Sequence, residues 1–95
     1  MKYHGIEITN IEIFGVPLVQ WKYKQCVAEF GVNEQENWAT LCTIRSLSEG
    51  KGHATHVLAE AKTFYESQGK RFGGSVALNS RMKAIYQRLG VTEYC

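Results

Sequence analysis

The segment Glu49–Leu58 reads EGKGHATHVL and leads from a glycine-rich turn into the start of an amphipathic helix. Gly50 and Gly52 allow the backbone to turn tightly and to approach a ligand closely. The first N–H groups of a helix have no partner within the helix, and the positive end of the helix dipole lies behind them. The segment therefore predicts an anion site that suits a phosphate group, although such turns more often only connect a strand to a helix.

The length of 95 residues predicts a single domain, residues 1–95, with one core. Eleven Lys and Arg against nine Asp and Glu are scattered along the chain, a balance that gives little support for nucleic acid binding. The three cysteines form no C-x-x-C pair, and no N-terminal apolar run resembles a signal peptide or a membrane span. We therefore expect a cytoplasmic protein that binds neither nucleic acid nor membrane.

The first half of the chain has an apolar period of two, which predicts antiparallel strands. Ile6–Ile13 and Val19–Tyr23 alternate in this way, with a turn expected at Gly15–Pro17 between them. Two further runs, Cys26–Phe30 and Trp38–Ile44, extend the predicted sheet.

The alternative for residues 17–31 is a helix, with Pro17 at its first position and Gly31 as its stop. The alternation of Val19–Tyr23 and the β-rich composition favour strands.

The second half changes to a period of 3.6 after the glycine turn. A helix is expected up to Gly69, with Ala54, Val57, Leu58, Ala61 and Phe64 on its inner face. Phe72–Leu78 reads as a buried strand, Asn79 and Ser80 as the cap of a second helix that ends at Gly90, and the last five residues as one more strand. The inner face of that second helix would carry Met82, Ile85, Tyr86 and Leu89. This order predicts an α+β fold, a mixed β-sheet whose antiparallel N-terminal strands are followed by β-α-β-α-β, with the helices packed on the sheet.

Neither the histidines nor the cysteines predict a metal site or a nucleophile. His53 and His56 lie one helical turn apart, but no evident set of carboxylate or thiol partners completes a metal site with them, so we expect them to face solvent. Cys26, Cys42 and Cys95 are expected to be small packing residues.

Two motifs resemble those of the GNAT superfamily of acyl-CoA-dependent N-acetyltransferases. The family's pyrophosphate loop reads Gln or Arg, two residues, Gly, one residue, then Gly or Ala, and Glu49–Ala54 fills its last two fixed positions. The family also has an Asn followed seven residues later by a Tyr and then by Leu-Gly, and the chain has Asn79, Tyr86 and Leu89-Gly90 at that spacing. The resemblance covers roughly the second half of the chain and implies a GNAT-like fold.

The resemblance implies transfer of an acetyl group from acetyl-CoA to an amine. Backbone N–H groups of the loop and the charge of Lys51 would hold the CoA pyrophosphate, and the strand near Cys42–Ile44 would splay from its neighbour and contact the pantetheine arm. Tyr86 would give a proton to the departing thiolate, although a Tyr on the inner face of a helix is also an ordinary core residue. The site residues implied are Tyr86 for catalysis and, for the cofactor, Cys42, Thr43, Ile44, Glu49, Gly50, Lys51, Gly52, His53, Ala54, Thr55 and Asn79.

Three departures from the family pattern matter. Glu49 places an acid where the family prefers Gln or Arg, which weakens an electrostatic hold on pyrophosphate. The strand Trp38–Ile44 has no carboxylate, so the general base would be Glu29, Glu36 or water. The chain lacks the family's early helices and a strand after its last residues, so we expect an open acceptor side that suits a protein lysine or N-terminus, and an edge that a homodimer could cover.

Two other functions remain open. One is a catalytically silent GNAT-fold module that masks a partner protein, as compact bacteriophage members of the superfamily that block host machinery do, with Trp21, Tyr23 or Trp38 as contact residues if they are exposed. The other is a nucleotide-binding or phosphate-binding module, which leaves the spacing from Asn79 to Tyr86 unexplained.

Overall fold

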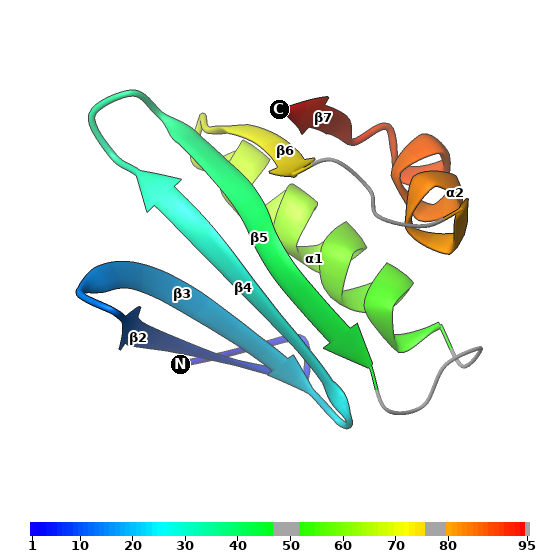
Figure 1. Cartoon of the computed structure of the whole chain (residues 1–95), viewed down its shortest axis with the longest axis horizontal. Coiled ribbons are helices and arrows are strands. Elements are labelled where there is room, and N and C mark those ends of the chain that lie inside the picture. Colours follow the sequence, from blue (N-terminus) through cyan, green and yellow to red (C-terminus); the bar gives the residue numbers. More distant parts are fainter. Residues whose placement is uncertain (47–51, 76–79, 95) are drawn as a thin grey trace.

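The computed structural model describes residues 1–46, 52–75 and 80–94, with only the backbone for Tyr94. One seven-stranded sheet has the strand order β1-β2-β3-β4-β5-β6-β7, and two helices contact it (Figure 1). Neighbours up to β5 pair antiparallel, whereas β5 with β6 and β6 with β7 pair parallel. The α+β fold with antiparallel N-terminal strands followed by β-α-β-α-β is therefore confirmed. The elements are β1 (Lys2–Tyr3), β2 (Ile6–Ile13), β3 (Val16–Tyr23), β4 (Cys26–Asn33), β5 (Trp38–Ser46), α1 (His53–Ser67), β6 (Arg71–Ser75), α2 (Ser80–Leu89) and β7 (Thr92–Tyr94).

The N-terminal strands follow the predicted alternation, and the helix considered for residues 17–31 is wrong. β2 and β3 pair continuously from Glu7↔Lys22 to Ile13↔Val16. Trp21, in the middle of β3, is fully buried, and its indole N–H donates to the Tyr65 hydroxyl at 3.1 Å. Strand pairing buries this face, whereas a helix would have needed a different set of buried positions.

Several strand boundaries differ from those predicted. The β2–β3 turn is at Phe14 and Gly15, both in the left-handed region with φ of 50° and 78°, and not at Gly15–Pro17. Pro17 already lies in β3 opposite Glu12, and β3 pairs with β4 only from Val19 onward, so the missing N–H of Pro17 removes no ladder hydrogen bond to β4. Similarly, β4 does not end at Gly31 but continues to Asn33.

Both helices lie on the same face of the sheet. Leu41 of β5 is paired with Gly74 of β6, so the two residues share a face, and Phe30 of β4 is opposite Leu41. Tyr65 of α1 contacts the ring of Phe30 at 5.8 Å between centroids, and Tyr86 of α2 lies directly over Gly74. The opposite face, which carries Glu29, is covered by neither α1 nor α2.

The core lies between α1 and the strands it crosses, β3 to β6. Its centre is an aromatic cluster in which Trp21, Phe30 and Phe72 of the sheet contact Tyr65 of α1. The buried apolar residues are Ile6, Trp21, Cys26, Ala28, Phe30, Ala39, Leu41, Val57, Leu58, Ala61, Tyr65, Phe72, Tyr86 and Val91.

Candidate functional site

Among the described residues, the ladder between the parallel strands β5 and β6 ends part of the way along β5, and we call this end of the ladder the separation of β5 and β6. The ladder runs from Trp38↔Arg71 to Leu41↔Gly74, and β5 then continues to Ser46 paired with β4 alone (Figure 1). Beyond Leu41 the backbone N–H and C=O groups on the β6 side of β5 have no strand beside them among the described residues. The described ladder thus ends just before Cys42–Ile44, where the resemblance implies a splay, but residues 76–79, which follow β6, lie outside the described part of the chain. Backbone groups of β5 that have no neighbouring strand could hydrogen-bond a ligand.

A β-bulge marks the same position on β5. Glu29 is paired with Thr43 but the next residue, Phe30, is paired with Leu41, so Cys42 is the extra residue of the bulge. Its side chain is exposed, which corrects the expectation that Cys42 packs in the core. Its thiol lies 3.7 Å from the Thr40 carbonyl oxygen. Cys26, by contrast, is fully buried as expected, whereas Cys95 lies outside the described residues.

Among the described residues, the first turn of α1 has backbone donors without a helical acceptor. Gly52 precedes the helix with φ of 76°, and the first helical hydrogen bond runs from the His56 N–H to the Gly52 carbonyl at 2.9 Å. The N–H groups of His53, Ala54 and Thr55 therefore have no acceptor within the helix. The first turn holds no acidic residue, so the positive end of the helix dipole is not neutralised there. Glu49, Gly50 and Lys51 lie outside the described residues.

The two histidines of α1 do not face solvent as expected. His53 and His56 are half-buried, and their rings contact Tyr23 of β3 with centroids 5.5 Å and 4.6 Å away. The Nδ1 atom of His53 is buried and has no hydrogen-bond partner in the part of the chain that the structure describes. Packing against Tyr23 therefore holds the start of α1 on the sheet.

Tyr86 reaches the end of β6 from α2. Its side chain is 3% exposed, and its hydroxyl donates to the Ser75 carbonyl oxygen at 3.1 Å. A Cβ atom added at Gly74 would overlap this hydroxyl, so only glycine leaves room for the ring at that position. Burial, and to a smaller extent the charge of Glu93, raises the pKa of Tyr86, so its hydroxyl holds its proton at neutral pH. Asn79 lies outside the described residues.

These three groups lie at one edge of the sheet. β5 and β6 run parallel, so their carboxyl ends point the same way, and the chain enters α1 after β5 and α2 after β6. The carboxyl edge of parallel strands is where ligands bind in open α/β sheets. The unpaired edge of β5 after Leu41, the first turn of α1 and the Tyr86 hydroxyl at Ser75 therefore flank the separation.

The two carboxylates considered as a base are placed differently. Glu29 lies on the helix-free face beside the bulge, half-buried, and accepts a hydrogen bond of 2.7 Å from the Thr43 hydroxyl. Glu36 is exposed in the β4–β5 turn, at the opposite end of β5, and accepts a hydrogen bond of 3.0 Å from the Trp38 indole N–H. Only Glu29 is next to the separation of β5 and β6.

Two features of the site were not predicted from the sequence. The bulge at Cys42 gives no pattern of its own, because one extra residue in a strand of mixed composition does not alter the apolar alternation clearly. The close contact of Gly74 with Tyr86 did leave a signal, since two adjacent glycines inside the buried strand 71–75 indicate a close approach of another group.

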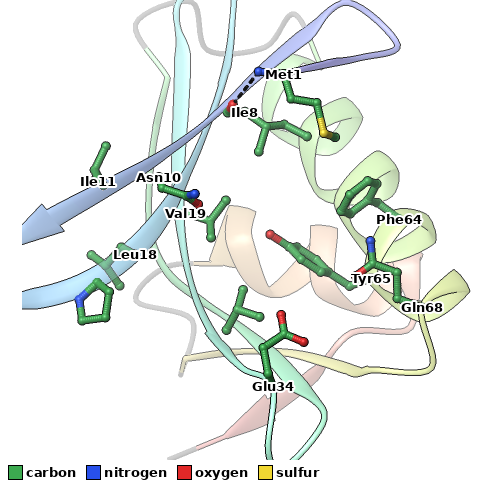
Figure 2. A pocket seen from close by; sticks show the side chains of 12 residues that line it. Met1, Ile8, Asn10, Ile11, Leu18, Val19, Glu34, Phe64, Tyr65 and Gln68 are labelled. Atoms are coloured by element: carbon green, nitrogen blue, oxygen red, sulfur yellow. Dashed lines mark hydrogen bonds between the residues drawn. The ribbon is translucent and has the colours of Figure 1, made fainter.

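A separate pocket of about 380 Å³ lies at the other end of α1 (Figure 2). Its walls are mainly apolar, with Ile8 and Val19 on the sheet side and Phe64 and Tyr65 on the helix side. None of the residues proposed for the cofactor or for catalysis lines it. The pocket therefore belongs to a different region of the molecule.

Scans against protein-family models, curated proteins and solved structures found no match. Within residues 1–46, 52–75 and 80–94, no three or more His, Cys, Asp or Glu side chains gather as a metal site would require. No helix in the same ranges is long and apolar enough to cross a membrane.

Proposed function

We propose that the chain is an acyl-CoA-dependent N-acetyltransferase that resembles the GNAT superfamily in fold and mechanism. The observation that carries this proposal is that the β5–β6 ladder ends at Leu41↔Gly74. The helix that follows β5 in the sequence, α1, has N–H groups in its first turn without a helical acceptor. A cofactor with a pyrophosphate at one end and an amide-containing arm at the other needs both kinds of donor. The cofactor is acetyl-CoA.

The helix α1 binds one part of the cofactor, and the strand β5 binds another. The N–H groups of His53, Ala54 and Thr55 bind the pyrophosphate, because they have no acceptor in α1 and lie at the positive end of its dipole. The pantetheine arm extends along Cys42–Ile44 and hydrogen-bonds the edge of β5 that β6 has left. This arrangement places the thioester near the bulge.

Tyr86 supplies the proton for the leaving group. As the acceptor nitrogen attacks the thioester carbonyl, the nitrogen–carbon bond forms, the carbon–sulfur bond breaks and the thiolate takes the hydroxyl proton of Tyr86. The proton that the acceptor nitrogen loses passes to solvent, and solvent returns a proton to the Tyr86 oxygen. The raised pKa keeps that proton on Tyr86 at neutral pH, and the hydrogen bond to Ser75 holds the hydroxyl at the end of β6. Proton transfer of this kind contributes on the order of 10²-fold to 10⁴-fold to rate.

The acceptor approaches the helix-free face beside the bulge, where Glu29 takes the proton of an incoming ammonium. Thr43 fixes the Glu29 carboxylate with a hydrogen bond, and no helix of the described residues covers this face. An uncovered face suits an amine on a protein surface, either a lysine or an N-terminus, better than a small metabolite that must be enclosed.

Calorimetric titration with acetyl-CoA, CoA and inorganic phosphate tests the proposal. Gly52→Asp places a carboxylate at the start of α1 and is expected to abolish acetyl-CoA binding. Gly69→Asp is the matched control, because Gly69 has φ of 81° just after the other end of the same helix and likewise has open space around it. Equal affinity of the wild type and Gly52→Asp would contradict the proposed site.

A silent module that masks a partner protein is the second candidate, and the uncovered face favours it. Trp38 lies half-buried on that face next to the exposed Cys42, whereas Trp21 is fully buried and is excluded as a contact residue. This candidate expects no acetyl-CoA binding, and a simple phosphate-binding module expects phosphate and CoA to bind with similar affinity. The same titration therefore separates all three functions.

A further inference from the structure

The outer edge of β2 is uncovered over much of its length. β1 pairs only with Ile6 and Glu7, and the Ile8 N–H donates to the Met1 carbonyl oxygen at 2.7 Å. The Met1 amino group donates to the Ile8 carbonyl oxygen at 3.2 Å (Figure 2). From Asn10 to Ile13 no strand lies on the outer side within the described part of the chain. We call Asn10–Ile13 the open edge. An unpaired strand edge is a template for pairing with another chain.

Exposed apolar side chains gather around the open edge. Among the described residues, the large apolar side chains that are exposed are Met1 at 67%, Ile13 at 37%, Phe14 at 102% and Val16 at 54%. Met1 lies at one end of the open edge, and the other three lie at the β2–β3 turn at its other end. Such a concentration at one edge marks an interaction surface.

The hydrogen-bonding pattern of the open edge is self-complementary. Ile8 directs its N–H and C=O outward to Met1, so Asn10 and Glu12 also direct theirs outward, because outward groups recur at every second residue. A second β2 strand placed antiparallel with Ile11 opposite Ile11 sets Asn10 opposite Glu12 in both directions. In that register the outward groups of the two copies meet as hydrogen-bonded pairs.

We propose that the open edge binds a second copy of this chain about a two-fold axis at Ile11, forming one continuous sheet. The cross-strand pairs fit this occupant. The Asn10 amide can donate to the Glu12 carboxylate of the second copy, and the two Ile11 side chains face each other on the helix-free face. Phe14 of the second copy lies beside Met1, so both exposed apolar side chains become covered.

The self-complementary register favours a second copy over an unrelated strand. Any extended peptide can bond the edge, but the two-fold register covers the apolar groups at both ends of the open edge at once and repeats the Asn10–Glu12 pair. The interface is short and falls at the small end of specific interfaces, so a concentration-dependent equilibrium between monomer and dimer is expected. It forms whether or not the chain transfers acetyl groups.

Sedimentation analysis over a range of protein concentrations tests this dimer. The mass is expected to rise toward twice the 10.8 kDa of the chain. Ile11→Lys and Ile11→Asp place like charges on the two-fold axis, so each is expected to stay monomeric alone, whereas an equimolar mixture of the two is expected to dimerise. Val27→Lys is the matched control, because Val27 is also half-buried on the helix-free face but lies on β4, away from the edge.

Glu12→Pro tests the same dimer without relying on the folding of the Ile11 variants. The N–H of Glu12 points outward, so its removal breaks no hydrogen bond to β3 but does break the bond to the second copy. A folded, monomeric Glu12→Pro supports the dimer. The dimer is overturned if the wild type remains monomeric at all concentrations, if Glu12→Pro still dimerises, or if the folded Ile11 variants fail to associate when mixed.

Discussion

The antiparallel strands β2 to β4 and the parallel strands β5 to β7 belong to one sheet but differ in how completely their backbones pair. β2 and β3 pair without interruption from Glu7↔Lys22 to Ile13↔Val16. Among the described residues, β5 and β6 pair from Trp38↔Arg71 to Leu41↔Gly74, and β5 continues beyond that pair. The β2–β3 ladder leaves no unpaired backbone groups between its two strands, whereas the end of the β5–β6 ladder is where we propose that a ligand binds.

The two regions also differ in the size of the side chains that they bury. Trp21 and Phe30, the largest fully buried side chains, come from β3 and β4. The parallel strand β6 contributes Gly73 and Gly74 at its centre, where a larger side chain on Gly74 would displace Tyr86. The molecule thus concentrates apolar burial under α1, and the two glycines of β6 leave room for the Tyr86 ring.

Trp21→Ala is expected to have the largest effect on the antiparallel region. It removes a fully buried ring and leaves the Tyr65 hydroxyl without its donor, so the free energy of unfolding should fall by about 3–5 kcal/mol. Urea denaturation measures this. Trp38→Ala, at a half-buried indole, is the control, and a loss at Trp38 equal to that at Trp21 would contradict the proposed distribution of burial.

The free energy of unfolding at alkaline pH should depend on Cys26, which lies in the antiparallel region. Burial raises the pKa of the Cys26 thiol from its ordinary value of 9.0 to about 11. The unfolded chain therefore releases this proton first, so stability is complete below pH 9 and falls as the pH rises to 11, by up to roughly 2–3 kcal/mol. Denaturation of the wild type and Cys26→Ala across this range checks it, since an unchanged pH slope in Cys26→Ala would contradict the assignment.

Gly74→Ala is the corresponding change in the parallel region. The new methyl group meets the Tyr86 ring, whose Cζ lies 2.7 Å from the Cβ position, so a loss of about 1–3 kcal/mol in unfolding free energy is expected. Acetyl transfer should fall as well, because Tyr86 must move. Gly31→Ala is the matched control, since its Cβ meets the Cys42 thiol at an ordinary 3.5 Å. Similar losses in both variants would show that the fit of Tyr86 on Gly74 has no special role.

Tyr86→Phe should have the smallest effect on stability and a selective effect on function. Loss of the hydrogen bond to Ser75 costs about 1 kcal/mol, and the ring stays in place. Turnover is expected to fall on the order of 100-fold while acetyl-CoA affinity stays unchanged. Steady-state kinetics beside calorimetry separates the two quantities, and full turnover in Tyr86→Phe would exclude Tyr86 as the proton donor.

The sequence predicted the fold better than the site. The alternation in Val19–Tyr23 and the helical period after Gly52 were strong signals. Burial of one face of a strand or helix decides which residues are apolar along the whole element. The ends of the strands were predicted less well. Pro17 can lie in β3 because β4 does not pair with β3 at that residue, so its missing N–H removes no hydrogen bond. The sequence of β3 alone does not show where β4 stops pairing. The termination of the β5–β6 ladder and the bulge at Cys42 likewise depend on pairing between distant segments.

Single side chains in the site were predicted unevenly for the same reason. The position of Tyr86 on the inner face of its helix followed from periodicity, but its contact with Gly74 required the neighbouring strand. His53 and His56 were expected to face solvent because the helix alone does not reveal that Tyr23 lies against them. The exposed Cys42 was unexpected because it follows the inward-facing Leu41 and so lies on the other face of the sheet, and the sequence alone did not show that neither helix covers that face.

The most direct test of the central claim is a titration of isotopically labelled protein with acetyl-CoA, followed through the backbone amide resonances. If the separation of β5 and β6 is the cofactor site, the largest shifts will fall at Cys42–Ser46, at the first turn of α1 and at Ser75, with little change in β2 and β3. Shifts around Phe64 and Tyr65 instead, or no shifts at saturating acetyl-CoA, would contradict the claim.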